Sequence, residues 1–159
     1  MINMGKDGLK IRPLEGGDIN DLFEWRNYPE VREKSFNTSI LSWDEHERWF
    51  KAKREDPNTT IYIAYSEGQK TGSIRFEDKG EAIKVSVMLN PDFLGKGLGS
   101  EVIKLGTERF LKEKKPDKPI HAEIKKNNIA SFKAFQKAGY RKSHVVYIWE
   151  KNDGNQHSR

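Results

Sequence analysis

One segment, residues 89–100, constrains the fold of this chain more than any other. A run rich in β-branched residues, 83–89, ends at Asn90-Pro91, and glycines follow at positions 95, 97 and 99, where a helical pattern begins. This order places the free N–H groups of a helix N-terminus behind a turn whose backbone can approach an anion closely. The glycine spacing does not match the phosphate loop of nucleotide hydrolases, G-x-x-x-x-G-K-S/T. It also differs from the G-x-G-x-x-G pattern of dinucleotide-binding folds. The segment therefore predicts a phosphate site that differs from both common nucleotide loops.

Length and composition set the broad class. The 159 residues suit one domain, which we expect to span residues 1–151, with a flexible tail at 152–159. The absence of cysteine excludes disulfides and thiolate chemistry, and the four histidines are scattered, so we expect no metal. No apolar run approaches the roughly 20 residues of a membrane span, and the first residues do not resemble a secretory signal. We therefore expect a cytoplasmic protein without a membrane partner.

The chain carries a net charge of +5. A nucleic-acid partner is one interpretation of this excess, but the basic residues are spread along the chain and interleaved with acids. A solvated surface, or attraction of a small polyanionic ligand such as coenzyme A or a nucleotide sugar, fits that distribution better. We therefore expect a small-molecule partner and no nucleic acid.

Hydrophobic periodicity and capping residues predict the order of elements. Asp18 and Asn128 are expected N-caps, Ser42 and Glu45 form a capping box, and Gly139 stops the last helix. The expected strands are 9–14, 60–66, 70–77, 82–89, 120–124 and 145–149, and the expected helices are 18–25, 42–54, 97–113 and 128–138, with a helical turn at 30–33. The predicted fold class is α/β (α+β), with a mixed, mostly antiparallel sheet flanked by helices.

The glycine segment resembles the central motif of the GNAT superfamily of acyl-CoA-dependent N-acetyltransferases. Its matching residues are Leu89, Pro91, Gly95, Lys96, Gly97 and Gly99, whereas Leu94 stands where the family usually has Arg or Gln. A second block, 127–131 with 135–140, resembles the family's C-terminal motif. The resemblance covers nearly the whole chain and implies the GNAT acyl-CoA N-acyltransferase fold with acetyl-CoA as the acetyl donor.

The resemblance also implies how the donor is held. Backbone groups of the strand would bind pantetheine, the turn would bind the pyrophosphate, and Asn128 and Ser131 would contact the pantetheine arm, unless those two only cap the helix. Phe135 occupies the place where the family commonly has a tyrosine that protonates the leaving thiolate, so Tyr140, Tyr147, the amine or water would have to supply that proton. The expected cofactor-binding residues are Val87, Met88, Leu89, Leu94, Gly95, Lys96, Gly97, Leu98, Gly99, Ser100, Asn128, Ser131 and Phe135.

Three residues are candidates for the group that accepts the proton of the attacking amine. Glu77 ends one predicted strand, and His121 shares a strand face with Glu123. Histidine as a residue type titrates near neutral pH and suits this role. The alternative is that each is an ordinary solvated strand-end residue, and that Glu77 pairs with Arg75.

Two N-terminal segments, 24–32 and 42–50, resemble the amino-sugar N-acetyltransferases of pseudaminic-acid biosynthesis, which acetylate the 4-amino group of a UDP-linked deoxy-sugar. Charged groups there would meet phosphate or sugar hydroxyls, and indole rings would stack on a sugar or base, although Trp25 and Trp49 also suit core packing. The expected substrate-binding residues are Trp25, Arg26, Asn27, Arg32, His46 and Trp49.

Three functional classes stay open from the sequence. The first is an enzyme that acetylates a nucleotide-linked amino sugar. The second is an acetyltransferase for a protein N-terminus, as in the ribosomal-protein type, or for another small amine. The third is an inactive module that binds acyl-CoA or nucleic acid. A homodimer is compatible with each of them.

Overall fold

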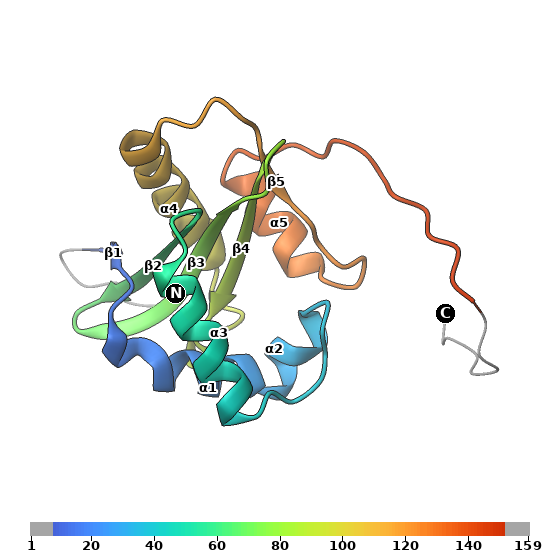
Figure 1. The fold of residues 1–159 in the computed structure, drawn as a ribbon. Helices are drawn as coiled ribbons and strands as arrows, with labels where there is room; N and C mark the ends of the chain where they lie inside the picture. Colours follow the sequence, from blue (N-terminus) through green and yellow to red (C-terminus); the bar gives the residue numbers. More distant parts are fainter. Residues whose placement is uncertain (1–7, 152–159) are drawn as a thin grey trace.

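The computed structural model describes residues 8–151, so the tail predicted at 152–159 and the segment compared with a signal peptide lie outside the described residues. Its centre is a five-stranded sheet in the order β1-β2-β3-β4-β5 (Figure 1). The strands are β1 (Lys10–Pro13), β2 (Thr59–Ser66), β3 (Gln69–Asp78), β4 (Ile83–Leu89) and β5 (Ile120–Ala122). Neighbours from β1 to β4 are antiparallel and β4 pairs with β5 in parallel, which confirms the mixed, mostly antiparallel sheet.

Helices cover both faces of the sheet (Figure 1). On one face lie α1 (Ile19–Asn27), α2 (Pro29–Lys34) and α3 (Trp43–Glu55), and on the other lie α4 (Gly99–Lys114) and α5 (Ile129–Lys137). Two short 3-10 turns, η1 (Gly16–Asp18) and η2 (Pro91–Phe93), precede α1 and follow β4. The predicted strands and helices up to residue 138 are thus present, with ends shifted by a few residues.

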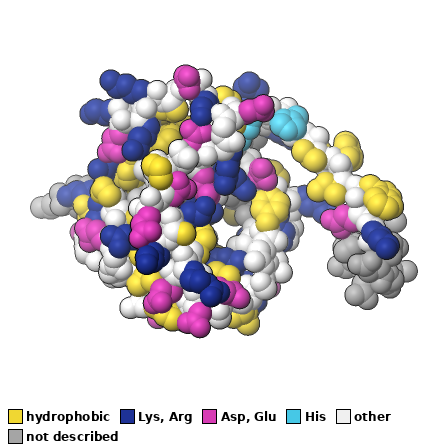
Figure 2. All heavy atoms as spheres, viewed as in Figure 1, with side chains coloured by type: hydrophobic (Ala, Val, Ile, Leu, Met, Phe, Trp, Pro, Cys, Tyr) yellow, Lys and Arg dark blue, Asp and Glu magenta, His cyan; other side chains and the backbone are white. Residues whose placement is uncertain are grey.

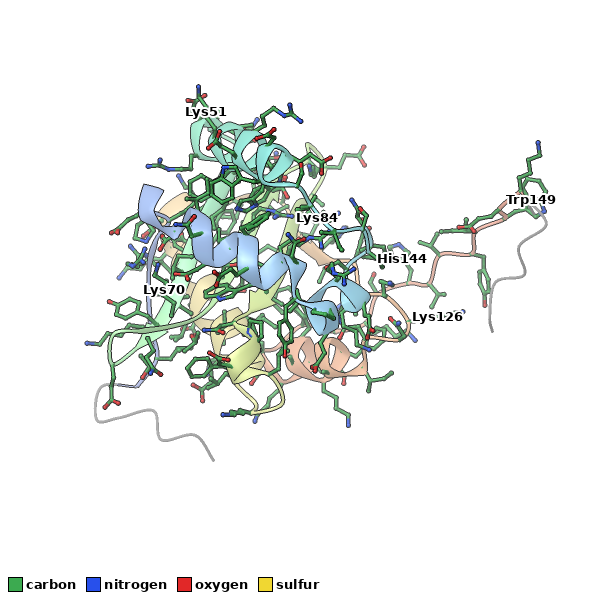
Figure 3. All side chains as sticks on the ribbon, turned by 90° about the horizontal axis from the view of Figure 1, so that it is seen from below. Lys51, Lys70, Lys84, Lys126, His144 and Trp149 are labelled. Carbon is green, nitrogen blue, oxygen red and sulfur yellow. The ribbon has the colours of Figure 1, made fainter. Side chains whose placement is uncertain are left out.

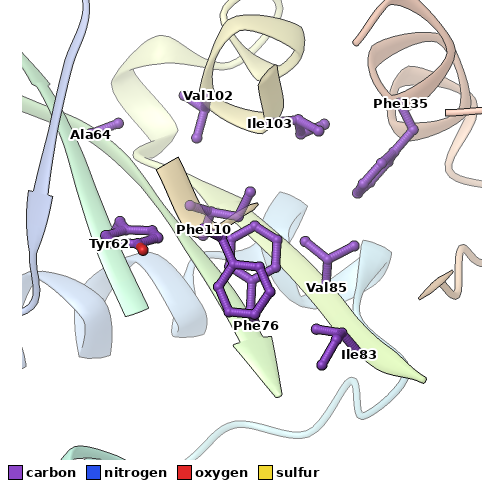
Figure 4. Close-up of a cluster of buried hydrophobic side chains, with 10 residues drawn as sticks. Tyr62, Ala64, Phe76, Ile83, Val85, Val102, Ile103, Phe110 and Phe135 are labelled. Atoms are coloured by element: carbon purple, nitrogen blue, oxygen red, sulfur yellow. The ribbon is translucent and has the colours of Figure 1, made fainter. Parts of the chain in front are cut away.

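The larger core lies between the sheet and the α4–α5 layer (Figure 4). Phe76 of β3 stacks on Phe110 of α4 with ring centroids 4.3 Å apart. Gly106 lets α4 approach the sheet closely, because a Cβ there would lie 2.6 Å from Cγ2 of Ile74. Full burial of such side chains stabilises the fold by about 1.5–3 kcal/mol each. The close contact fixes the position of α4, and therefore of its N-terminus, against the sheet.

Two predicted caps are present and a third is not. The Ser42 hydroxyl accepts a hydrogen bond from the Glu45 N–H, and the Asn128 side chain accepts one from the Ser131 N–H. The prediction that the Asp18 side chain caps α1 is wrong, since that carboxylate is buried and accepts hydrogen bonds from Arg12, at 2.8 and 2.9 Å, and from the Glu15 N–H. Burial alone would raise the pKa of Asp18, but these donors, with Lys70, outweigh it and hold the pKa well below its usual range.

The predicted strand at 145–149 is also wrong. Residues 138–151 contain neither helix nor strand, and from Arg141 onward every one is exposed. In Figure 1 this segment leaves the body of the molecule. A strand needs a neighbour that takes its backbone hydrogen bonds, and no described strand of the sheet lies beside it.

Candidate functional site

The turn after β4 is held in place by Asn90. Its N–H donates to the Thr71 carbonyl at 2.9 Å, and its side-chain amide donates to the Lys70 carbonyl at 2.8 Å. Its side-chain oxygen accepts from the Asp92 N–H at 3.0 Å. These bonds tie the end of β4 to the start of β3 before the chain turns toward α4. The turn therefore has a fixed starting point on the sheet.

The glycines that follow Asn90 in the sequence have the conformation that an anion site needs. Gly95 and Gly97 have φ of 72° and 76°, in the left-handed region that side chains other than glycine rarely adopt. A Cβ at either position would meet nothing within 4 Å, so the turn is open on its outer side. Leu98 is buried and anchors the turn, and α4 begins directly afterwards at Gly99. The first N–H groups of α4 are thus available to a phosphate group.

The edge of β4 next to this turn is free. β5 pairs with β4 only at Ile83–Val85, although β4 continues to Leu89. Over residues 86–89 no described strand lies on that side, so the backbone groups of Met88 and its neighbours are open to an extended ligand. The glycine turn follows this strand edge directly in the chain, and the expected pantetheine-binding and pyrophosphate-binding positions lie on these two segments.

Two expected donor-site residues, Asn128 just before α5 and Phe135 on it, have structural contacts. Asn128 caps the helix at the Ser131 N–H, with a bond of 3.2 Å. Phe135 is buried, and its ring packs edge-to-face on Tyr140 with centroids 5.1 Å apart. Tyr140 in turn bonds Thr107 of α4 at 2.8 Å. The hydroxyl of Tyr140, one of the two tyrosines considered as a proton donor, is therefore occupied by a contact inside the fold, whereas Tyr147 is exposed.

The strand register brings the three proton-acceptor candidates to one face. Ile83 and Val85 point into the α4 core, so Lys84 between them points to the α1–α3 face. Lys84 lies opposite Glu77 on β3 and opposite His121 on β5, and Glu123 follows His121 by two residues. The sheet thus presents Glu77, His121 and Glu123 to the side covered by α1, α2 and α3.

Glu77 is buried in a cluster of cations. Lys53 and Arg75 bond its two carboxylate oxygens at 2.7 and 2.6 Å, and Lys79 lies 3.3 Å away. Burial by itself raises the pKa of Glu77, but the hydrogen bonds and charges of Lys53 and Arg75 lower it to about 2. The carboxylate is therefore charged and a weak proton acceptor near neutral pH. The pairing with Arg75, considered above as an alternative, is the arrangement that the structure has.

Arg26, Asn27 and Arg32 hold the loop that joins α2 to α3. The Asn27 side chain bonds both the N–H and the carbonyl of Leu41, and Arg32 donates to the Thr38 carbonyl. Arg26 donates through Nη2 to the Asn37 carbonyl, whereas its Nη1 is buried with no hydrogen-bond partner. Burial lowers the pKa of Arg26, and the charges of Arg32 and Arg75 lower it further. Arg26 thus has an unsatisfied buried donor on the α1–α3 side, where the charges of Arg32 and Arg75 also act on it.

His46, Trp25 and Trp49 lie deeper than expected for substrate-binding groups. Trp25 and His46 are buried, and the His46 Nε2 donates to the Ile19 carbonyl at 2.9 Å, since a carbonyl can only accept. Trp49 stacks on His46 and packs against the apolar cluster under α1 and α3, and the Arg75 guanidinium lies 5.2 Å from its ring centroid. Trp49 therefore supports Arg75 at the site, while His46 packs between α1 and α3.

Two lysines join α2 to the loop between β5 and α5. Lys34 donates to the Asn127 carbonyl at 2.9 Å, and Lys125 donates to the carbonyls of Glu33 and Ser35 at 2.9 and 3.1 Å. The joined residues are 90 to 93 positions apart in the sequence. We call these three hydrogen bonds the α2 latch, and they link α2 to the segment that leads into α5.

Sequence reasoning missed several of these groups. Lys53 was not singled out, and Arg75 was considered only as a partner of Glu77. The available signal was the alternation along β3, which places Arg75 and Glu77 on one face, but the lysine from α3 could not be placed without the packing. Among the described residues, no group of three or more His, Asp or Glu could hold a metal ion. No helix in that part of the chain is long and apolar enough to cross a membrane.

Comparisons with known proteins agree with this geometry. Residues 9–141 match the model of the family described as Acetyltransferase (GNAT) domain. An uncharacterized protein of Methanocaldococcus jannaschii is 26% identical over 145 residues, or 88% of this chain, but the chain spans 30% of its length. Acetyltransferase PseH of Campylobacter jejuni is 25% identical over 126 residues, which cover 77% of this chain and 76% of PseH.

Solved structures share the fold at lower identity. One is a spermidine N-acetyltransferase from Vibrio cholerae in complex with CoA and spermine, with a TM-score of 0.78 at 17% identity. The superposed region covers 91% of this chain and 88% of the neighbour. The aminoglycoside acetyltransferase AAC(6')-Ib, in complex with coenzyme A, has a TM-score of 0.74 at 20% identity, over 87% of each chain. The family match spans most of the sequence and agrees with the strand order, the glycine turn and the open β4 edge: the chain belongs to the GNAT acetyltransferase family.

Proposed function

We propose that this protein transfers an acetyl group from acetyl-CoA to a primary amine of a small, negatively charged acceptor, most specifically the 4-amino group of a UDP-linked amino-deoxy-sugar. The observation that carries the proposal is the buried Nη1 of Arg26, which has no hydrogen-bond partner and lies on the side of the sheet opposite the α4 core, where the charges of Arg32 and Arg75 also act on it. A buried cationic donor without a partner is costly, and a phosphate oxygen would satisfy it. The two structural neighbours named above are an aminoglycoside acetyltransferase and a spermidine N-acetyltransferase, and the relative PseH is also an acetyltransferase.

The donor side of the site fits coenzyme A. The turn at 94–100 offers backbone N–H groups at the start of α4 to a pyrophosphate, and the positive φ values of Gly95 and Gly97 keep that side free of side chains. The open β4 edge at Val87, Met88 and Leu89 offers N–H and C=O groups to the amides of pantetheine. When bound, acetyl-CoA supplies the acetyl group as a reactive thioester carbonyl. In this proposal a backbone N–H of β4 donates to that carbonyl oxygen and stabilises negative charge on it.

The acceptor amine must lose a proton before or during attack. Of the three candidates, Glu77 is bonded to Lys53 and Arg75 and stays ionised. His121 and Glu123 lie on the same side of the sheet and are exposed, so they are open to an amine or to a water that relays its proton. We assign proton acceptance to His121, with Glu123 beside it, and assign to Glu77 the task of fixing Arg75 in the acceptor site.

The charge of the site selects among acceptor classes. Arg26, Arg32, Arg75 and Lys84 lie on the acceptor face, and Glu77 is already neutralised by its own partners. A polyamine would add further positive charge to this surface and be repelled. A nucleotide sugar brings a diphosphate that the guanidinium groups can bind bidentately.

The test is a turnover assay with acetyl-CoA and a panel of acceptors, followed by product mass. The panel contains a UDP-4-amino-4-deoxy-sugar, the same amino sugar without UDP, spermidine, an aminoglycoside and a peptide with a free N-terminus. We expect kcat/KM for the UDP-sugar to exceed that for the free sugar at least about tenfold. Arg26→Gln should raise KM for the UDP-sugar and leave the free sugar unaffected, and Arg54→Gln on α3 serves as the matched control. Turnover that favours spermidine or the peptide, or equal turnover of the two sugars, would refute the acceptor assignment.

A further inference from the structure

The described chain ends in an exposed segment whose side chains suit a buried strand. In residues 143–149, which we call the arm, Val145, Val146, Tyr147, Ile148 and Trp149 are consecutive, and between 59% and 94% of each is exposed. β-Branched and aromatic residues favour strands, and exposed apolar surface of this extent marks an interaction site. In Figure 2 hydrophobic side chains line the segment that leaves the body.

The base of the arm is fixed and its outer part is not. Tyr140 bonds Thr107 and packs on Phe135, and its N–H donates to the Phe135 carbonyl at 2.9 Å. Beyond Tyr140 the chain departs: His144 lies near the body, whereas Trp149 lies well away from it (Figure 3), in agreement with Figure 1. The arm therefore extends outward from an anchored point at the α4–α5 surface.

The sheet has an edge that suits such a segment. β5 is the outermost strand, with three residues, and only its β4 side is paired within the described part of the chain. Its other side presents unpaired N–H and C=O groups, which readily accept an added strand.

The arm is apolar on both faces, and this property points to the occupant. Alternation in an extended strand puts Val145, Tyr147 and Trp149 on one face and Val146 and Ile148 on the other. A strand that is apolar on both faces belongs in the interior of a sheet, with a neighbour at each edge and layers above and below. A single arm added to the outside of one sheet would keep one edge and much of its apolar surface in water.

We propose that two copies of this chain exchange their arms, so that the arm of each copy pairs with β5 of the other. Around a twofold axis the two arms then also pair antiparallel with each other, and the two five-stranded sheets join through them. Each arm gains two neighbours, each β5 edge is covered, and one isologous interface meets all these requirements. The proposal rests on the arm and β5 alone and is independent of the acetyl acceptor.

The absence of cysteine makes this arrangement testable by cross-linking. Single cysteines are placed in turn at positions 145, 146, 147 and 148, and the proteins are oxidised at low concentration. Antiparallel pairing about a twofold predicts a disulfide-linked dimer that peaks at one or two of these positions. Sedimentation equilibrium of the unmodified protein should give twice the chain mass of 18.4 kDa.

Charge substitutions separate the arm from other surfaces. Val146→Lys with Ile148→Lys should lower the dimer fraction at least about tenfold at a fixed concentration, with an unchanged circular dichroism spectrum. Leu111→Lys, at an exposed apolar position on α4, is the matched control and should remain dimeric. A monomer whose arm is protected from hydrogen exchange would show that the chain covers its own arm, and a monomer with an unprotected arm would show that no second copy binds it. Either result would overturn the proposal, as would a dimer that survives the double substitution.

Discussion

The Arg75 guanidinium bonds the Glu77 carboxylate at 2.6 Å, two residues along the same strand. The Glu77 charge, also held by Lys53, keeps Arg75 on the acceptor face, and the Trp49 ring supports the guanidinium from the side. A residue that sequence alone suggests as a base thus acts in the structure as a counter-ion. A counter-ion and a base at position 77 would differ in their effects on stability and on catalysis.

Glu77→Gln should destabilise the fold in a pH-dependent way. The pKa of Glu77 is about 2 in the folded protein, below the ordinary value of 4.5, so its stabilising effect is present above pH 4.5 and is lost as the pH falls toward 2. We expect the variant to lose about 2 kcal/mol at pH 7, with the difference from wild type shrinking below pH 4.5. Urea unfolding across this range measures it, and Glu81→Gln, in the exposed β3–β4 turn, should show no such difference.

The same variant tests the catalytic assignment. If Glu77 only positions Arg75, Glu77→Gln should raise KM for a charged acceptor and leave the shape of the kcat–pH profile between pH 6 and 9 unchanged. His121→Gln should instead lower kcat by about 10²–10⁴-fold, the usual contribution of a general base. A kcat that collapses in Glu77→Gln and survives in His121→Gln would reverse the two roles.

Protonation of His46 should weaken the fold. Burial lowers the pKa of His46 more than its bond to the Ile19 carbonyl raises it, so the folded state favours the neutral ring. The folded pKa lies below the ordinary value of 6.5, and stability is therefore lost as the pH falls below 6.5. The free energy of unfolding should decrease between pH 7 and 5, with a smaller slope in His46→Phe. An equal slope in both proteins would contradict this, and His144→Gln on the exposed arm is the control.

Phe135→Tyr should not create the missing proton donor. The ring is 5% exposed and packs in the core against Tyr140, so an added hydroxyl must be buried there. We expect a loss of about 1–3 kcal/mol in stability and no gain in kcat. Phe132→Tyr, on the same helix at a position 36% exposed, should change neither. A raised kcat in Phe135→Tyr would show that the hydroxyl reaches the thiolate.

Much of the architecture follows from local patterns. The alternation in β2, β3 and β4 fixes which residues face α4, and the glycines at 95 and 97 are required by backbone geometry that few other residues adopt. Asp18 shows where such reasoning fails: its cap position is local, but its carboxylate binds Arg12 and Lys70 through the tertiary fold. Lys53 is a second example, because only the tertiary packing of α3 on the sheet brings this lysine to the Glu77 carboxylate. The strand predicted at 145–149 has residues that favour a strand but needs a neighbouring strand, which the segment itself cannot supply.

The α2 latch should control access to the acceptor face. Lys125→Met removes the bonds to the carbonyls of Glu33 and Ser35, which should increase hydrogen exchange in residues 33–41 and raise KM for the acceptor several-fold. Global stability should change by less than about 1 kcal/mol, because these bonds lie near the surface. Lys126→Met, at the adjacent exposed lysine, is the matched control. Unchanged exchange in 33–41 would show that the contacts do not restrain the loop.

Coenzyme A binding at the glycine turn is the central claim, and isothermal titration of three proteins tests it most directly. Gly97→Val and Gly80→Val place a side chain at φ of 76° and 97°, so both carry backbone strain, but only Gly97 lies in the turn before α4. We predict that wild type and Gly80→Val bind coenzyme A alike and that Gly97→Val binds at least about tenfold more weakly, or about 1.4 kcal/mol, while keeping its circular dichroism spectrum. Equal affinity of all three folded proteins would contradict the account.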